Sequence, residues 1–487
     1  MASSGDSSGA YKAIPSASTE GWVENRTFDE IAIGESAKMT REITKRDVDL
    51  FALVSGDLNP THVDEDYAKD SMHQRLLAHS LLSGAMISAV LGTKLPGAGT
   101  VYESQDLKFK TPLHIGDKAT VVVTVKEKDP VRKIIAMDCL CVDQDGREIM
   151  TGTARVFAPV EKVKRPPVEM AEVELLHHNR LRQLIQQAKQ YPPLSTAIVH
   201  PCDAVSLEGM DQAAREGLIK PILIGPEDKI REAAQKAGVK ISDYELIDVP
   251  HSVAAAQKSV ELARDGKVGA LMKGSLHTDE IMAAIVARNS GLRTGRRMSH
   301  VFVMDVPSYK WPLFITDMAI NIAPTLMEKK DICQNALDLA NAFGIENPKL
   351  AILAATETIN YSMPATLDAA ALCKMAQRKQ ITGGTLDGPL AFDNAISAEA
   401  AKIKGIVSPV AGQADILMTP NIESANMLAK QLTYLAAAEA AGIVLGAGVP
   451  VILTSRADSA QTRLASAALA VISMAGQRAR LAAKVAG

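Results

Sequence analysis

A carboxylate and an imidazole lie close together in residues 56–64, which read GDLNPTHVD. Gly56 favours the end of a helix, and Pro60 disfavours helical geometry at the residue before it. The turn therefore lets Asp57 and His62 face one point. A general base and a general acid facing one substrate suit the addition of water to a double bond. A capped Asx turn is the alternative, and it is the commoner origin of such a local pattern.

A second group of polar residues follows a predicted strand, in the loop from Lys273 to Thr278. Backbone N–H groups at the start of a helix, beside a lysine, suit an anion. His277 and Thr278 complete this candidate binding site. The loop has neither the lysine-serine pair of a P-loop nor a dinucleotide-binding glycine pattern. An ordinary strand-to-helix connection is the structural alternative.

Arg293, Arg296 and Arg297 gather cationic side chains beside a glycine. Arginine binds phosphate through two N–H groups at once, so these residues are candidates for phosphate binding. A solvated basic loop is the alternative. Asp387 and Asp393 are predicted to lie on a rigid turn, either as site carboxylates or as turn residues.

The last apolar strand is followed by a hydroxyl, a guanidinium and carboxylates in residues 454–459. Ser455, Arg456, Asp458 and Ser459 are the candidate site residues there. In folds with parallel strands, ligands bind at the carboxyl ends of the strands, where these loops lie.

The whole composition limits the classes of function. A chain of 487 residues predicts two or three domains, and a net charge of -3 gives no field that would attract nucleic acid. The five cysteines show no zinc-site spacing, which predicts a reduced, cytoplasmic protein. Residues 76–91 are too few and too polar to cross a membrane, so no membrane partner is expected.

The first third predicts an α+β domain. Thr44 caps a helix with Asp47 at the capping-box position, and residues 76–91 form a helix that is apolar nearly all round. Alternating strands are expected at 35–40, 100–109, 119–125, 134–142 and 149–157, with a hairpin turn at 143–146. This order indicates an antiparallel sheet curled around a central helix.

The remainder predicts an α/β domain with mostly parallel strands. Strands are expected at 197–200, 221–224, 245–249, 269–272, 301–305, 350–354, 415–418, 442–445 and 451–454. We therefore expect a disordered tail at 1–20, a first domain at 21–160, a Pro-rich linker with a helix at 161–192, and a second domain at 193–487. The linker helix could pack on the second domain or pair two subunits.

The first domain resembles the MaoC-like hot-dog hydratases, which are R-specific enoyl-CoA hydratases. The matching pieces are residues 56–64, 78–80, 95–100, 109–112 and 116–117. The resemblance implies that Asp57 and His62 activate the water that adds to an enoyl thioester, and that Asn59 holds the turn. It also implies that the backbone N–H of Ser80, where the family usually has glycine, polarises the thioester carbonyl. Ser88 matches a family serine near the site, with a structural helix serine as the alternative.

The second domain resembles the phosphate acetyl/butyryltransferases, whose folds have two lobes. The matching pieces are residues 221–225, 273–278, 317–321, 386–393, 409–415, 425–430 and 453–459, and they include Asp317 and Asn321. The resemblance implies exchange of CoA for phosphate on an acyl group. Ser455 matches the serine that contacts the CoA thiol, and Arg456 matches the arginine that stabilises charge at the reacting carbonyl and phosphate.

Two positions depart from one branch of that family. Thr462 stands where that branch has the aspartate that serves as base for the thiol, which leaves Asp458, Asp387 and Asp393 as candidates. Met282 stands where it has an arginine, so the arginines at 293, 296 and 297 are candidates for phosphate binding. These departures favour the butyryl-type side of the family.

The sequence thus predicts a bifunctional enzyme of acyl-CoA metabolism, with no permanently bound cofactor and no metal. Its expected substrates are CoA thioesters and phosphate, and its expected state is a homo-oligomer formed through both domains. The alternatives are a second domain that only senses acyl-CoA, a dehydrogenase, and a first domain that acts as a thioesterase.

Overall fold

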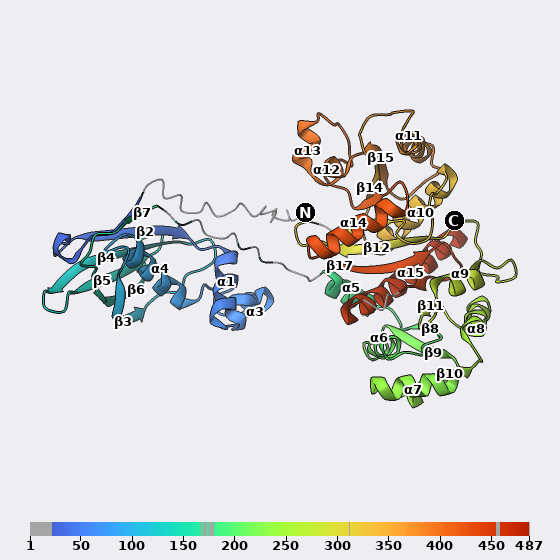
Figure 1. Cartoon of the computed structure of the whole chain (residues 1–487), viewed down its shortest axis with the longest axis horizontal. Helices are drawn as coiled ribbons and strands as arrows, with labels where there is room; N and C mark the ends of the chain where they lie inside the picture. Colours follow the sequence, from blue (N-terminus) through green and yellow to red (C-terminus); the bar gives the residue numbers. More distant parts are fainter. Residues whose placement is uncertain are drawn as a thin grey trace. The chain divides into compact units, whose positions relative to one another are not determined.

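The chain divides into two units, residues 1–175 and 176–487, each with its own sheet (Figure 1). The computed structural model describes residues 22–166, 168, 173, 175, 180–310, 312–453 and 458–486. The predicted tail at 1–20 lies outside the described residues. Within these ranges, none of the helices combines the length and the apolar character that crossing a bilayer requires.

The first unit contains a five-stranded antiparallel sheet in the order β2-β4-β5-β6-β3. Its strands are β1 Val23–Glu24, β2 Ser36–Glu42, β3 Val101–Phe109, β4 Lys118–Asp129, β5 Ile134–Val142, β6 Glu148–Phe157 and β7 Lys164–Arg165. Its helices are α1 Lys45–Ser55, α2 Pro60–Val63, α3 Glu65–Asp70 and α4 Ser80–Thr93. The predicted fold class, a hot-dog sheet around a helix, is confirmed.

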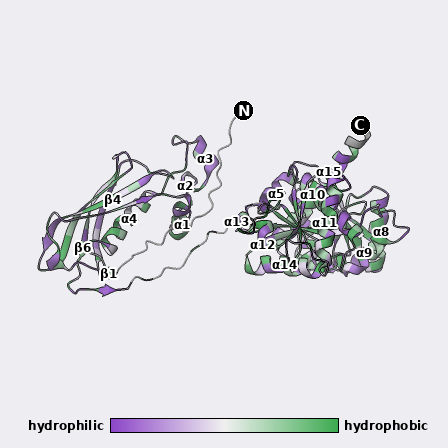
Figure 2. Ribbon diagram, turned by 90° about the horizontal axis from the view of Figure 1, so that it is seen from above, coloured by the Kyte–Doolittle hydropathy of each residue, from purple (hydrophilic) through white to green (hydrophobic). Residues whose placement is uncertain are grey.

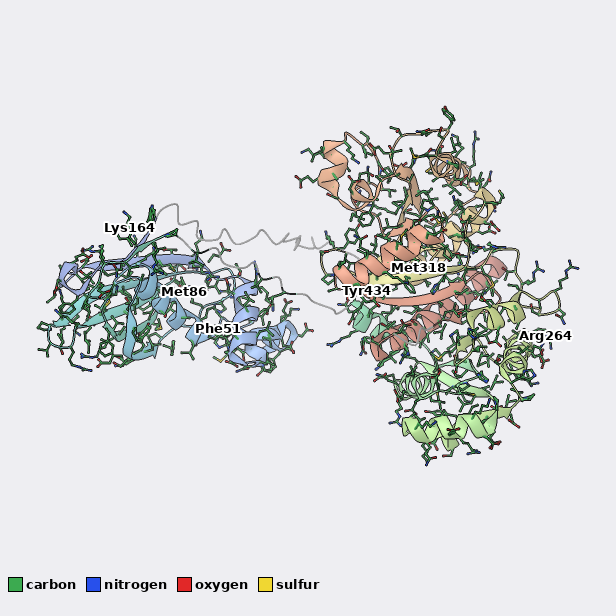
Figure 3. All side chains as sticks on the ribbon, in the orientation of Figure 1. Phe51, Met86, Lys164, Arg264, Met318 and Tyr434 are labelled. Atoms are coloured by element: carbon green, nitrogen blue, oxygen red, sulfur yellow. The ribbon has the colours of Figure 1, made fainter. Side chains whose placement is uncertain are left out.

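Alternating side chains explain why α4 lies against this sheet. Hydrophobic and hydrophilic residues alternate along the strands, as Figure 2 shows, so one face of the sheet is apolar. Met86 and Ile87 of α4 are buried against that face, and Met86 is labelled in Figure 3. Cys139 and Cys141 of β5 are buried free thiols. Burial raises the pKa of each thiol to about 11.

Two predictions for this unit need correction. The predicted helix at 76–91 begins only at Ser80, because the backbone of Leu77 and Ala78 pairs with residues 113–114 instead. The first unit extends past residue 160, where the sequence predicted its end, because β7 pairs with β1.

The second unit contains one sheet of eleven strands, in the order β10-β9-β8-β11-β18-β17-β12-β13-β16-β14-β15. The strands are β8 Leu194–Val199, β9 Ile219–Gly225, β10 Glu245–Asp248, β11 Ala270–Lys273, β12 Ser299–Asp305, β13 Leu313–Thr316, β14 Lys349–Leu353, β15 Thr385–Leu390, β16 Ile416–Met418, β17 Glu439–Leu445 and β18 Val451–Ile452. The first four strands in this order and β18 are parallel neighbours, and so are β13, β16, β14 and β15. The predicted, mostly parallel α/β arrangement is therefore confirmed.

Helices cover the faces of this sheet and fill the two lobes seen in Figure 1. They are α5 Arg180–Ala188, α6 Ala204–Arg215, α7 Glu227–Ala237, α8 Ser252–Arg264, α9 Thr278–Val286, α10 Leu326–Ala342, α11 Pro364–Gln377, α12 Phe392–Ile396, α13 Ala398–Ile403, α14 Ile422–Leu435 and α15 Ala460–Ala486. The predicted linker helix is α5. Its Leu181 and Leu184 are buried in the core of the second unit, so it packs there.

Candidate functional site

The Asp57–His62 turn is built by local rules. The helix α1 begins with the predicted Thr44–Asp47 capping box and ends at Gly56, whose φ of 75° is left-handed. Pro60 then opens α2, and the side-chain oxygen of Asn59 accepts hydrogen bonds from the N–H and the hydroxyl of Thr61, at 3.2 and 2.9 Å. Asn59 therefore holds the backbone of this turn.

The turn brings three side chains together at one point. Polar atoms of Asp57, His62 and His79 all lie within 4.8 Å of one another. The Asp57 side chain is 52% exposed, so solvent reaches it. The Nδ1 of His62 lies 2.9 Å from the carbonyl oxygen of Leu77. Because a carbonyl only accepts, Nδ1 carries the proton and leaves Nε2 of the neutral ring as an acceptor.

His79 joins this cluster although it was not among the predicted site residues. Its Nε2 donates to the backbone carbonyl of Asp57 at 3.0 Å, and its ring stacks on His62 with centroids 3.9 Å apart. Phe51 covers it from α1, with ring centroids 5.1 Å apart (Figure 3). His79 is 3% exposed, and its Nδ1 has no hydrogen-bond partner among the described residues. The signal in the sequence was the matching piece at residues 78–80, which contains His79.

Ser80 and Ser88 lie on α4. Ser80 is the first residue of that helix, so its backbone N–H has no carbonyl within the helix to bond. This N–H is the one that the sequence predicted for a thioester carbonyl. Ser88 lies beside Tyr102 of β3, and burial raises the pKa of Tyr102 to about 12.

In the second unit, the loop from Lys273 connects β11 to α9 as predicted, but most of its N–H groups are already bonded. Gly274 and Ser275 donate to the carbonyls of residues 199 and 200, at 2.9 and 2.8 Å. The backbone N–H of His277 donates to the carboxylate of Glu280 at 2.9 Å, because these two residues form the capping box at the start of α9. The predicted anion site therefore loses these three donors.

Asp317 and Asn321 form a buried hydrogen-bonded cluster after β13. The Asp317 carboxylate accepts from the backbone N–H groups of His300, Ala319, Ile320 and Asn321. Burial raises the pKa of Asp317, and these hydrogen bonds oppose that shift. The side-chain oxygen of Asn321 accepts from Nε of Arg297 at 2.6 Å. These contacts fix the backbone after β13, and they hold the arginine segment, residues 293–297, beside it.

The other predicted arginines have different neighbours. Arg296 bonds to Asp338 of α10, and a guanidinium nitrogen of Arg297 lies 3.3 Å from Glu328. Arg293 is exposed, and its backbone bridges to Ala447.

Strand directions separate the predicted residues of this unit into two sets. β17 is antiparallel to β18, β12 to β17, and β13 to β12. After three reversals, the carboxyl end of β13 lies at the sheet edge opposite the carboxyl ends of β11 and β18. Lys273, His277 and Thr278 therefore lie at one edge. Asp317, Asn321 and residues 293–297 before β12 lie at the other. The sequence predicted that all these loops lie together at the carboxyl ends of parallel strands, and that prediction is wrong.

Asp387 and Asp393 do not lie on one rigid turn. Asp387 is within β15, where its carboxylate accepts from the N–H of Gly388 at 2.8 Å, and Asp393 is in α12. A hydrogen bond from Lys404 holds the pKa of Asp393 below its usual range. Since β15 runs parallel to β13 through β16 and β14, Asp393 lies at the edge opposite the end of β18.

Comparison with known families gives two separate matches. Residues 252–471 match a family described as phosphate acetyl/butaryl transferase, and residues 30–141 match the MaoC like domain. A phosphate acetyltransferase of Rhizobium meliloti is 58% identical over 303 residues, which cover 62% of this chain and 96% of the relative. The chain belongs to the phosphate acetyl/butyryltransferase family.

Further relatives extend this assignment. A phosphate butyryltransferase of Clostridium acetobutylicum is 43% identical over 290 residues, covering 60% of this chain and 96% of the relative. The solved structure of a branched-chain phosphotransacylase from Enterococcus faecalis is 29% identical with a TM-score of 0.52, and covers 58% of this chain and 99% of that one. The predicted fusion of a MaoC-like domain with a phosphate acetyl/butyryltransferase domain is confirmed. The predicted preference for the butyryl side gains no support from these identities.

The Ser455–Arg456 pair on which the phosphate acetyl/butyryltransferase prediction relied lies outside the described residues. The residues that follow this pair, from Asp458 on, are described. The backbone carbonyl of Asp458 accepts from Arg463 at 2.6 Å, and the Ser459 hydroxyl accepts from the N–H of Thr462 at 3.1 Å, which caps α15. Of the three candidate base carboxylates, only Asp458 follows the carboxyl end of β18.

Proposed function

We propose that the second unit transfers an acyl group between CoA and phosphate. The observation that supports this most strongly is 58% identity to a phosphate acetyltransferase along 96% of that relative. A phosphate oxygen attacks the thioester carbonyl, the carbon–sulfur bond breaks, and the thiolate leaves and takes a proton. Ser455 contacts the sulfur, Arg456 stabilises the charge on the carbonyl oxygen, and Asp458 exchanges the thiol proton.

We propose that the first unit hydrates a trans-2-enoyl-CoA to an (R)-3-hydroxyacyl-CoA, reversibly. The juxtaposition of Asp57 and His62 within the MaoC-like region supports this. Water between the two groups adds its oxygen to C3 and gives up a proton to one of them, and a proton is delivered to C2. The N–H of Ser80 stabilises the negative charge that develops on the thioester oxygen.

The test uses two variants of the full chain. Asp57→Asn removes the carboxylate base and should lower hydration of crotonyl-CoA by at least about 100-fold. Arg456→Ala should lower the formation of acyl phosphate from acetyl-CoA or butyryl-CoA and phosphate by a similar factor. Each variant should retain the other activity. Asp66→Asn is the matched control, because the Asp66 side chain is 95% exposed near the turn and lies outside the cluster.

A second candidate function has one observation in its favour. The N–H and the hydroxyl of Thr462 both bond to Ser459, the cap of α15, so the residue at the position of the base in one branch of the family is engaged in this cap. This fits a second unit that binds acyl-CoA without transferring the acyl group. Failure of the wild-type chain to form acyl phosphate, together with binding of acyl-CoA, would establish this alternative.

We also propose that the chain forms a homo-oligomer through both units. Large apolar side chains are exposed on each of them. In the first unit they include Leu81, Val101 and Phe109, and in the second they include Met427, Tyr434 and Leu435. Exposed apolar groups of this kind often mark contacts between subunits. Sedimentation should show an assembly larger than one chain, and a lone monomer at working concentration would refute this proposal.

A further inference from the structure

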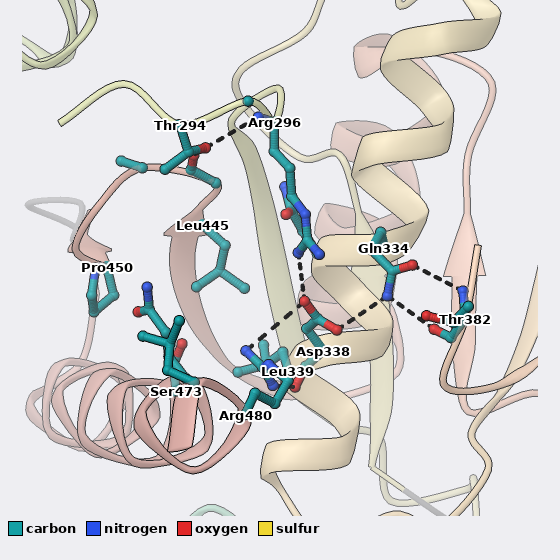
Figure 4. A pocket seen from close by; sticks show the side chains of 16 residues that line it. Thr294, Arg296, Gln334, Asp338, Leu339, Thr382, Leu445, Pro450, Ser473 and Arg480 are labelled. Atoms are coloured by element: carbon teal, nitrogen blue, oxygen red, sulfur yellow. Dashed lines mark hydrogen bonds and ion pairs between the residues drawn. The ribbon is translucent and has the colours of Figure 1, made fainter. Parts of the chain in front are cut away.

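The second unit contains a cavity of about 640 Å³. Its walls come from the segment before β12, from α10, from the end of β17 and from the last turns of α15 (Figure 4). Cavities of 300–1,000 Å³ are typical of sites for small molecules. The amino end of β12 lies at the sheet edge opposite the carboxyl ends of β11 and β18. The cavity is therefore separate from the site proposed for acyl transfer.

The charged groups that line the cavity are Arg296, Asp338 and Arg480. The Asp338 carboxylate is already engaged, by Arg296 at one oxygen and by the Gln334 amide at 3.1 Å at the other. Arg480 donates to the backbone carbonyl of Asp338 at 3.0 Å, while its nearest approach to that carboxylate is 3.9 Å. Two guanidiniums thus face one carboxylate, and the lining carries one surplus positive charge.

The two arginines keep N–H groups available. The side chain of Arg296 is 43% exposed and that of Arg480 is 41% exposed. Among the described residues, their remaining guanidinium N–H groups meet no protein acceptor. Figure 4 shows both side chains directed toward Asp338 from opposite sides. Two planar donors held by one carboxylate are suited to bind the oxygens of a phosphate or a carboxylate.

The opposite wall of the cavity is uncharged. Leu445 and Pro450 form its apolar part, and Ser473 of α15 adds a hydroxyl (Figure 4). An inorganic ion would leave this wall uncovered. A ligand with an anionic group at one end and a short apolar body at the other would contact both walls.

We propose that this cavity binds a small organic anion, namely a short-chain phosphate monoester or carboxylate. Arg296 and Arg480 hold its anionic group, and Leu445 and Pro450 contact its apolar body. The sequence predicted phosphate binding for Arg296. The structure supports that chemistry but places it at the edge of the sheet opposite the transferase loops.

Calorimetric titration of the full chain with butyl phosphate tests the proposal. Titration with butyrate tests a carboxylate in the same way, and titration with 1-butanol tests an uncharged ligand of the same chain length. The wild type should bind butyl phosphate or butyrate and should not bind 1-butanol. Arg480→Gln should weaken that binding at least about tenfold, since it removes one of the two charged donors. Arg478→Gln is the matched control, because Arg478 is an exposed arginine on the same helix and is not part of the lining. Neither variant should change acyl transfer at saturating substrates.

Arg456→Ala separates the two sites. Binding that is lost in Arg456→Ala and retained in Arg480→Gln would place the ligand at the transferase site and overturn the proposal. Equal affinity of wild type and Arg480→Gln, equal binding of 1-butanol, or no binding to the wild type at millimolar concentration would also overturn it. Arg480→Lys preserves the charge and should restore part of the affinity, which distinguishes loss of the ligand contact from loss of folding.

Discussion

Backbone groups hold the three side chains at the Asp57 turn. The Asp57 carboxylate accepts from the N–H of Asn59 at 3.3 Å, and the two histidines meet the carbonyls of Leu77 and Asp57. Asp57 and His79 are 4.0 Å apart at their nearest side-chain atoms, which is too far for a hydrogen bond. The carboxylate and the Nε2 of His62 therefore remain available to water and substrate, while the backbone fixes their positions.

His79 should act as a positioning residue for hydration. His79→Leu removes the donor to the Asp57 carbonyl and leaves the acceptor of this partly buried hydrogen bond unpaired, at a cost of about 1 kcal/mol. We expect kcat for crotonyl-CoA to fall by roughly tenfold or more, with a shifted pH profile. The reason is that Asp57 loses a hydrogen bond to its carbonyl and His62 loses the ring that stacks on it. His79→Gln retains an N–H donor and should recover part of the rate. Wild-type kcat and pH profile in His79→Leu would exclude this role.

The sequence predicted the Asp57–His62 pair because one turn of nine residues contains everything that shapes it. The contribution of His79 was not predictable in the same way. It arises from a different segment, which the pairing of Leu77 and Ala78 with residues 113–114 brings beside the turn. Asn321 shows the same limit, because its hydrogen bond from Arg297 depends on strand order and not on local spacing.

At the level of elements, the individual strands were easier to predict than their directions. Most strands are apolar runs, and such a run has the same pattern in either direction. The reversals at β17, β12 and β13, which move Asp317 away from Lys273, were therefore not visible. β13, which has four residues, was also missed. β15 was missed because Gly388-Pro389 suggests a turn, but β15 is the last strand of the sheet, where proline is tolerated.

The hairpin between β5 and β6 gives a prediction for acid stability. Burial alone would raise the pKa of Asp143, but hydrogen bonds from the backbone and side chain of Arg147 and from Asp145 hold it below the usual value. A carboxyl whose pKa is lower in the folded state stabilises the protein above its unfolded pKa of about 4. That contribution is lost as pH falls through the folded pKa.

Asp143→Asn should therefore destabilise the first unit at pH 7, by about 1.5–3 kcal/mol for a hydrogen-bonded charge. The difference from wild type should shrink as pH falls below about 4. Urea unfolding followed at pH 7, 5 and 3 measures this. Asp145→Asn is the control, since the Asp145 side chain is 65% exposed. A stability difference between wild type and Asp143→Asn that stays constant across this pH range would contradict the argument.

At the level of the whole molecule, two sheets have separate hydrophobic cores. One core surrounds α4 in the first unit, and two further cores pack against the eleven-stranded sheet of the second unit. Stability in such a chain belongs to each unit, so one free energy of unfolding does not describe it. The antiparallel sheet of the first unit and the fusion were predictable, because each unit carries its own complete pattern of strands and motifs.

Matched core substitutions should reveal this separation. Ile87 of α4 and Ile198 of β8 are both fully buried, and replacing either by alanine should cost its own unit about 2–5 kcal/mol. After brief heating of the full chain, Ile87→Ala should lose crotonyl-CoA hydration at a lower temperature than wild type and keep acyl-phosphate formation unchanged. Ile198→Ala should show the reverse. If either substitution lowered both inactivation temperatures equally, the two units would unfold as one cooperative structure, and the separate cores would have to be coupled through contacts between them.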